Sequence, residues 1–246
     1  GHTVVFVHGN PTWAFLWRRV IAELRARRPE LRLVAPDLIG LGRSSKPRRP
    51  EAHTLAHHGA WLADAIAQVA PGPLVLVGQD WGGAIGLLAM AGRAAQLRGI
   101  VLGNTAVSPP AEGFKPTLFH RLARVPLASN VLFEWLGFPL GSMHRTQGDR
   151  SSIRGDVARA YRWPLEHRAD RVAPLALARM VPDSATEHPS LAALRTTDAL
   201  FREAKVPIAL VWGTKYPSVG RVVNHLARLR PDAKVTKREA GHFLQE

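Results

Sequence analysis

The chain has 246 residues, 46% of them hydrophobic, which is enough to bury one sizeable core and suits a single domain with an insertion. Its 33 Lys and Arg residues outnumber its 19 Asp and Glu residues, and the net charge is +14. The basic residues are mostly arginines scattered through Ala- and Leu-rich segments such as Leu24 to Arg28. We interpret them as a solvated surface, and we expect no nucleic-acid partner.

Cysteine is absent, which excludes disulfides and thiolate-ligated metals and is compatible with a reducing compartment. No apolar run approaches the roughly 18 residues that span a bilayer, and no signal peptide precedes the first motif. We therefore expect a cytoplasmic protein without a membrane span. A strand pattern begins at Thr3 without preamble and the chain stops soon after His242, so both ends look cut.

Short runs typical of buried strands alternate with helical patterns along most of the chain. Strands are predicted at 3–7, 31–35, 74–77, 100–102, 208–212 and near 235, and helices at 17–24, 55–69, 82–90 and 219–229. From Val107 to about Pro189 the alternation gives way to helical segments punctuated by proline. The pattern predicts an α/β fold: a mostly parallel sheet covered by helices, with a core at 1–106 and 190–246 and an inserted helical cap at 107–189.

The sequence Gly78-Gln79-Asp80-Trp81-Gly82-Gly83 lies between a buried strand and a helix. This is the position and the glycine pattern of the nucleophile elbow in the α/β-hydrolase fold, where the nucleophile is usually serine. A carboxylate is already an anion at neutral pH and can displace a leaving group from an sp³ carbon without a base. We therefore predict that Asp80 is a nucleophile that forms an alkyl ester with its substrate. Taken alone, the motif would also suit an Asp that caps a helix.

The turn His8-Gly9-Asn10-Pro11 follows the first strand. In this fold that turn supplies one backbone N–H of the oxyanion hole, and the residue after the nucleophile, Trp81, supplies the other. His242 stands in a Gly-His-Phe sequence after the last strand, where the fold places its general base. The order of Asp80 and His242 along the chain supports a catalytic pair.

Four motifs carry a resemblance to the haloalkane dehalogenases, over nearly the whole chain except the cap. They are His8-Gly9-Asn10-Pro11-Thr12-Trp13, Pro36-Asp37-Leu38-Ile39-Gly40, Gln79-Asp80-Trp81-Gly82-Gly83 and Ala240-Gly241-His242-Phe243. The resemblance implies a small apolar substrate and a halide product, with the Asn10 amide and the Trp81 indole N–H binding the departing halide. Thr12-Trp13 and Asn104-Thr105-Ala106 are most similar to the branch that also contains β-lactone decarboxylases of olefin biosynthesis.

The third member of the triad departs from the family's pattern. Tyr216 stands where the family typically has an aspartate, and Asn104 occupies the position that supplies the acid in one branch. Asn104 could accept a hydrogen bond from His242, but an amide cannot offset the charge of an imidazolium. We therefore expect hydrolysis of the alkyl ester to be impaired.

Three other functions remain open from the sequence. A β-lactone decarboxylase would use the same Asp, Asn, Trp and His set, and a non-catalytic ligand-binding member of the fold would fit the departure at Tyr216. An epoxide hydrolase resembles this chain in its nucleophile, but that resemblance calls for two cap tyrosines and the cap offers only Tyr161. No phosphate loop, dinucleotide fingerprint or metal-ligand spacing occurs, and we expect no cofactor.

Overall fold

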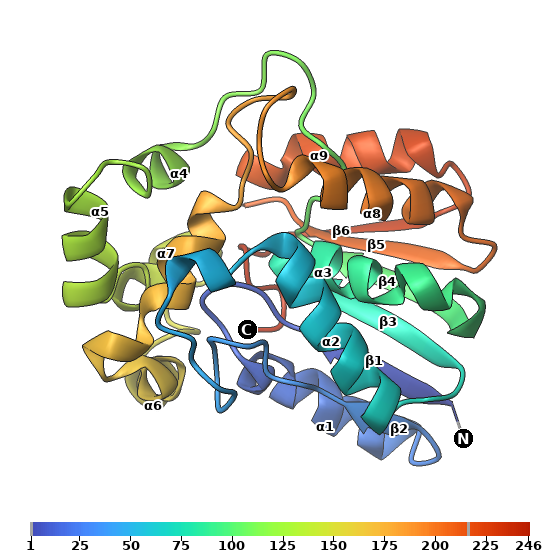
Figure 1. Cartoon of the computed structure of the whole chain (residues 1–246). Coiled ribbons are helices and arrows are strands. Elements are labelled where there is room, and N and C mark those ends of the chain that lie inside the picture. Colours follow the sequence, from blue (N-terminus) through green and yellow to red (C-terminus); the bar gives the residue numbers. More distant parts are fainter. Residues whose placement is uncertain (1, 216) are drawn as a thin grey trace.

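The structure is a computed structural model that describes residues 2–215 and 217–246. Its centre is a sheet of parallel strands in the order β2-β1-β3-β4-β5-β6, drawn in Figure 1. The strands are β1 (Thr3–Val7), β2 (Arg32–Val34), β3 (Leu74–Gln79), β4 (Leu97–Gly103), β5 (Ile208–Gly213) and β6 (Lys234–Arg238). The predicted parallel sheet is confirmed, and each predicted strand is present. Strand β4 begins before the predicted 100–102, because Arg98 and Gly99 interrupt the apolar run that the prediction relied on.

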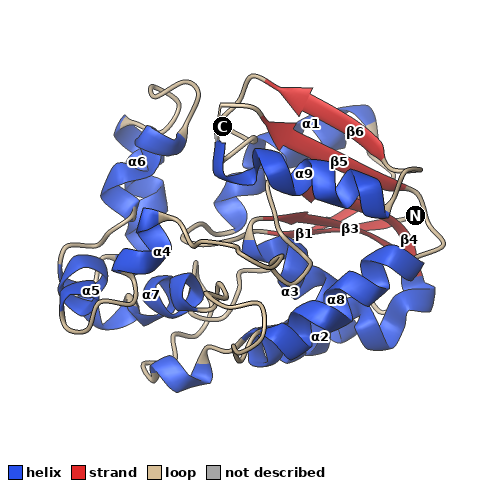
Figure 2. Ribbon diagram, turned by 90° about the horizontal axis from the view of Figure 1, so that it is seen from above, coloured by secondary structure: helices blue, strands red, loops and turns tan. Residues whose placement is uncertain are grey.

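Helices connect the strands and cover the sheet. They are α1 (Arg18–Arg27), α2 (Leu55–Val69), α3 (Trp81–Met90), α8 (Leu191–Glu203) and α9 (Pro217–Leu229). Figures 1 and 2 show α2, α3 and α8 side by side over one face, with α1 on the other. Helix α8 was missed by the sequence interpretation, although Leu191, Leu194 and Phe201 give it a buried stripe at helical spacing.

The strand order places a topological switch point between β1 and β3. From β1 the chain runs through α1 to β2 at one edge of the sheet, and from β3 it runs through α3 to β4 in the opposite direction. In open parallel sheets, ligands bind outside the carboxyl ends of the strands at such a point. The loop of Gly9 and Asn10 follows β1 and Asp80 follows β3 directly, so the fold brings two of the predicted motifs to this crevice.

The segment between β4 and α8 contains residues 107–189, which the sequence predicts to be a cap, and we call this segment the cap. It contains α4 (Leu118–Leu122), α5 (Ala128–Asn130), α6 (Gly155–Arg162) and α7 (Val172–Arg179). In Figures 1 and 2 these helices lie beyond the carboxyl ends of the strands. Shorter turns complete the chain, namely the 3₁₀ turns η1 (Ala14–Trp17), η2 (Pro50–Ala52), η3 (Ala91–Gln96), η5 (Leu140–Thr146), η6 (Trp163–Leu165) and η7 (Arg168–Asp170) and the π-helical turn η4 (Val131–Trp135).

Two sets of buried apolar side chains hold these parts together. The large one fills both faces of the sheet and reaches into the cap through Leu140, Met143 and Tyr161. A small one joins α7 to the outer cap helices through Ala123, Phe133, Leu175 and Ala178. Within residues 2–215 and 217–246 we find no helix that is long and apolar enough to cross a membrane.

A buried pair of histidines lies at the start of α2. His53 Nδ1 is 3.2 Å from His58 Nε2, and His53 Nε2 is 2.9 Å from the Pro47 carbonyl oxygen. His58 is only 1% exposed. Burial lowers the pKa of His58 from 6.5 to about 3, and the neighbouring histidines act in the same direction. The ring is therefore neutral in the folded protein at ordinary pH.

This depressed pKa predicts acid destabilisation. Between pH 6.5 and about 3 the unfolded state binds a proton at His58 that the folded state does not, so the free energy of unfolding falls as the pH falls through that window. The slope from one such group approaches about 1.4 kcal/mol per pH unit. We expect His58→Gln, measured by urea unfolding at a series of pH values, to show a shallower slope than the parent. Equal slopes would contradict the assignment.

Candidate active site

The turn from β3 into α3 holds Asp80 in a conformation that an L-residue rarely adopts. Its φ is 53° and its ψ is −130°, and α3 begins at the next residue. Such backbone costs of order 1–3 kcal/mol and persists where surrounding contacts enforce it. Here the Asp80 carbonyl accepts hydrogen bonds from Gly83 N–H at 3.1 Å and from Thr105 Oγ1 at 2.5 Å. The carboxylate is thereby lifted above the carboxyl edge of the sheet, as predicted for a nucleophile elbow.

Glycines allow the neighbouring backbone to approach this turn closely. A Cβ atom on Gly9 would overlap the Cβ and the carboxylate of Asp80, and a Cβ on Gly82 would overlap the carbonyl of Val7. The glycines of both motifs are therefore needed for contact between the turn after β1 and the elbow after β3.

The Asp80 carboxylate is held between the two predicted partners. Asn10 N–H donates to Asp80 Oδ1 at 2.8 Å, and His242 Nε2 lies 3.4 Å from Asp80 Oδ2. Burial raises the pKa of Asp80, but the hydrogen bond and charge of His242 and the backbone N–H groups of Trp81 and Asn10 outweigh it, so the pKa lies below its usual value. The carboxyl group is thus an anion at neutral pH, with both N–H groups of the predicted oxyanion hole directed at it.

The side chains on the β1 side of the site are tied to the cap. Asn10 Nδ2 donates to the carbonyl of Pro174 in α7 at 2.9 Å, which leaves its second N–H for another acceptor. Trp13 Nε1 donates to the carbonyl of Ala160 in α6 at 3.1 Å. The cap therefore fixes the orientation of the Asn10 amide.

The loop that carries His242 is also tied to the cap. His242 is buried, and its backbone N–H donates to the Thr146 carbonyl at 2.9 Å. Gln147 pairs with the backbone of Phe243 in both directions, accepting at 2.9 Å and donating at 3.0 Å. Sequence reasoning missed Gln147, because its partner lies 96 positions away along the chain.

Asn104 has a different role from the one the sequence suggested. Its Oδ1 accepts from Gly213 N–H at 3.1 Å, and its Nδ2 donates to the carbonyls of Gly241 and His242 at 3.0 and 2.7 Å. The amide thus anchors the backbone of the loop that carries His242, and these bonds replace the expected acceptance of a hydrogen bond from the His242 ring. Tyr216, the other candidate acid position, lies outside the described residues.

Gln79 is a further site residue that the sequence interpretation did not single out. It is buried at the end of β3, and its Nε2 lies 3.3 Å from His242 Nε2 and donates to the His242 carbonyl at 3.3 Å. Its position next to the nucleophile was the available signal. Gln79 therefore helps to set the position of the imidazole against Asp80.

A cap histidine interacts electrostatically with this site. His120 in α4 interacts electrostatically with Asp80 and with His242, and its Nδ1 is 2.7 Å from Thr117 Oγ1. Burial lowers the pKa of His120 to about 4, so the ring is neutral at neutral pH. A neutral imidazole has one N–H donor, and in the contact with Thr117 either Nδ1 or the hydroxyl can be the donor.

Two residues of the motifs serve the scaffold. His8 is fully buried, its Nε2 accepts from Leu38 N–H at 2.9 Å, and burial lowers its pKa. Asp37 accepts from Ala14 N–H at 2.7 Å and from Arg43 N–H at 2.8 Å, which ties the turn after β1 to the loop after β2. The cap tyrosine Tyr161 donates its hydroxyl to Glu246 and is buried, so it is not directed at a substrate.

The comparisons with known proteins agree with this geometry. The model of the alpha/beta hydrolase family matches residues 4–246. A haloalkane dehalogenase of Mycobacterium marinum is 32% identical over 100% of this chain and 80% of its own length. The chain belongs to the haloalkane dehalogenase family. Haloalkane dehalogenase 1 of Mycobacterium tuberculosis is 31% identical over 99% of the chain and 78% of its own length.

The fold of this chain is similar to that of haloalkane dehalogenases whose crystal structures are known. A single-site variant of the haloalkane dehalogenase of Agrobacterium tumefaciens has a TM-score of 0.88 and 23% identity, and it covers 100% of this chain and 84% of its own. The protein is thus an enzyme of the hydrolase class with the α/β-hydrolase fold. For this dehalogenase-family member the predicted fold class is confirmed.

The close approach at Gly9 gives a direct prediction. Gly9→Ala should displace the Asp80 carboxylate, because the added methyl overlaps it, and misplacement by about 1 Å can lower a rate by about 10²-fold. Gly92→Ala is the matched control, since a Cβ there meets nothing within 4 Å. Both variants should be folded by circular dichroism, and halide release from a bromoalkane should drop in the first alone. Parental activity in Gly9→Ala would show that the approach is not required.

Proposed function

We propose that this enzyme removes halide from haloalkanes by hydrolysis, through a covalent ester of Asp80. The observation that carries the proposal is the placement of one carboxylate between two different partners: Oδ1 at 2.8 Å from Asn10 N and Oδ2 at 3.4 Å from His242 Nε2. One oxygen is in the position of an oxyanion and the other is beside the base. This arrangement suits a nucleophile that becomes an ester and is then hydrolysed.

In the first step, a lone pair on Asp80 Oδ2 attacks the carbon that bears the halogen. The carbon–halogen bond breaks and the halide leaves with the bonding electrons, so no proton is transferred. The leaving halide needs only hydrogen-bond donors. We assign these to the Asn10 Nδ2 hydrogen that is not bound to Pro174 and to the indole N–H of Trp81, the residue that opens α3.

In the second step, water attacks the carbonyl carbon of the Asp80 ester while His242 Nε2 accepts the proton. Negative charge develops on Oδ1, which Asn10 N–H already contacts. The tetrahedral intermediate then expels the alcohol, which takes the proton back from His242, and the Asp80 carboxylate re-forms as the second proton of the water is released to solvent. Gln79, 3.3 Å from His242 Nε2, helps to position the base. These steps use side chains and backbone alone, so the proposal includes no cofactor. We also propose a cytoplasmic location, with which the lack of cysteine is compatible.

A β-lactone decarboxylase is the second candidate, and His120 is the observation that favours it. Both leaving groups are stabilised by hydrogen-bond donors, but oxygen that leaves a strained ring accepts stronger hydrogen bonds than a halide does, so an additional donor near Asp80 favours the lactone more. His120 offers a neutral imidazole from the cap to the neighbourhood of Asp80. Halide release from haloalkanes and carbon dioxide release from β-lactones, measured with the same preparation, would separate the two functions.

Removal of the carboxylate tests the role of Asp80. Asp80→Asn replaces an anion by an amide that is a poor nucleophile, so turnover should fall by more than about 10⁴-fold. Asp64→Asn removes an exposed carboxylate from α2 and serves as the matched control. Halide release and intact mass should be followed together, the mass to exclude deamidation. Parental turnover by an Asp80→Asn variant that has kept its amide would show that Asp80 only caps the helix.

A further inference from the structure

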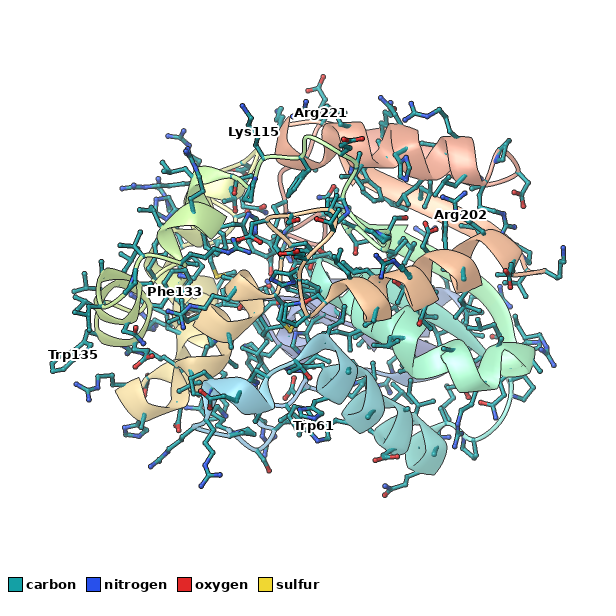
Figure 3. The ribbon with its side chains drawn as sticks, turned by 45° about the horizontal axis from the view of Figure 1, so that its top comes forward. Trp61, Lys115, Phe133, Trp135, Arg202 and Arg221 are labelled. Carbon is teal, nitrogen blue, oxygen red and sulfur yellow. The ribbon has the colours of Figure 1, made fainter. Side chains whose placement is uncertain are left out.

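The outer side of the cap exposes a group of large apolar side chains. Leu127 is 82% exposed, Leu136 is 73% exposed and Trp135 is 62% exposed. In Figure 3, Trp135 projects from the molecule at the edge farthest from the sheet. We call this group the cap outer face, and it consists of Leu118, Leu122, Val125, Leu127, Val131, Trp135 and Leu136. Large apolar side chains exposed along one stretch of chain, residues 118–136, are typical of an interaction surface.

The helices that carry this face are apolar on their inner side as well. Phe119, Phe133 and Phe138 form a cluster whose ring centroids lie 5.3 to 5.6 Å apart, packed toward α7. A helix that borders water normally has one apolar and one polar side. The segment from α4 to η4 already buries one apolar side against α7. Its other side, which borders water, also carries apolar side chains where polar ones are usual.

Leu127 is unfavourable in water for two reasons. Its φ is 59°, a region in which L-residues other than Asn and Asp are rare. Its side chain is also almost fully exposed and gains no packing energy in compensation. Asparagine would suit both the backbone and the solvent. A leucine with this backbone conformation and this exposure stabilises the protein only where its side chain is buried in apolar surroundings.

The charges of the segment that carries the cap outer face favour one kind of binding partner over another. Lys115, Arg121 and Arg145 are exposed, and residues 114–147 contain a single acidic residue, Glu134, which is partly buried. Asp183, from outside this range, pairs with Arg124 at 3.1 Å and leaves these three cations in excess. The guanidinium of Arg168 lies 3.8 Å from the centroid of the Trp135 ring. If a second copy of the chain covered this face, its cations would lie close to the same cations of the first copy, and they would repel each other. An anionic bilayer attracts them and accepts the leucines and the tryptophan at its interface.

We propose that the cap outer face docks on the surface of an anionic lipid bilayer, with Leu127, Trp135 and Leu136 inserted at the boundary of the headgroups. Lys115, Arg121 and Arg145 then contact lipid phosphates. The strain at Leu127 is offset by burial of its side chain in the bilayer. Such docking places the cap of the enzyme where apolar molecules concentrate. It does not depend on the chemistry at Asp80.

Vesicle sedimentation with the whole chain tests the proposal. The parent protein is mixed with vesicles of phosphatidylcholine alone and of phosphatidylcholine with phosphatidylglycerol. Binding should require the anionic lipid and weaken as salt is raised. Leu127→Asn should weaken binding by at least about tenfold, the loss expected for one buried leucine, while its melting temperature stays equal or rises. Trp135→Ser should also weaken binding, and Val69→Asn, at an exposed valine in α2, should not.

Asp80→Asn should bind vesicles as the parent does, so loss of catalysis and loss of docking are distinguishable. Absence of binding to anionic vesicles would overturn the proposal. Binding that Leu127→Asn and Trp135→Ser leave unchanged would overturn it too, since it would arise from basic residues elsewhere. A dimer in light scattering that Leu127→Asn converts to monomer, without vesicle binding, would show that a second copy covers this face.

Discussion

The strained backbone at Asp80 is the constraint on which the site depends. A positive φ at this one residue turns the chain from β3 into α3 and places the carboxylate over the sheet edge. The cost of order 1–3 kcal/mol is offset by the hydrogen bonds that the Asp80 carbonyl accepts from Gly83 and Thr105. Because the turn also directs the start of α3 at the carboxylate, the proposed nucleophile and the proposed oxyanion hole depend on the same local geometry.

The cap takes part in this geometry as well as covering it. Its Pro174 carbonyl orients the Asn10 amide, and its Thr146 and Gln147 hold the backbone of the loop that carries His242. The two loops belong to opposite ends of the chain, and the cap contacts both. A shift of the cap would therefore move both the proposed halide donor and the proposed base.

The elements that the sequence predicted best are those set by local patterns. The elbow around Asp80, the turn at Asn10 and the succession of strands along the chain follow from short runs of residues whose backbone needs are specific, such as Gly9 and Gly82. Helix α8 was equally local and was missed, because the polar residues 195–198 interrupt its apolar stripe.

Contacts over long sequence separations could not be predicted. Asn104 was expected near the imidazole, yet its amide is used by backbone 109 to 138 positions away. An amide can serve either purpose, and only the packing of β4 against β5 and the final loop decides which. The same holds for Gln147, and for His120, whose side chain interacts with the site only once the cap has folded over the sheet.

The central claim is that Asp80 itself becomes bonded to the substrate, and isotope transfer in a single turnover tests it most directly. Excess enzyme is mixed with a haloalkane in water enriched in oxygen-18, and both the alcohol and the peptide containing Asp80 are weighed by mass spectrometry. The account predicts that the first alcohol carries ordinary oxygen taken from Asp80, while the heavy oxygen enters the Asp80 carboxylate. An alcohol that carries oxygen-18 from the first turnover, with an unlabelled Asp80, would show direct attack by water and contradict the account.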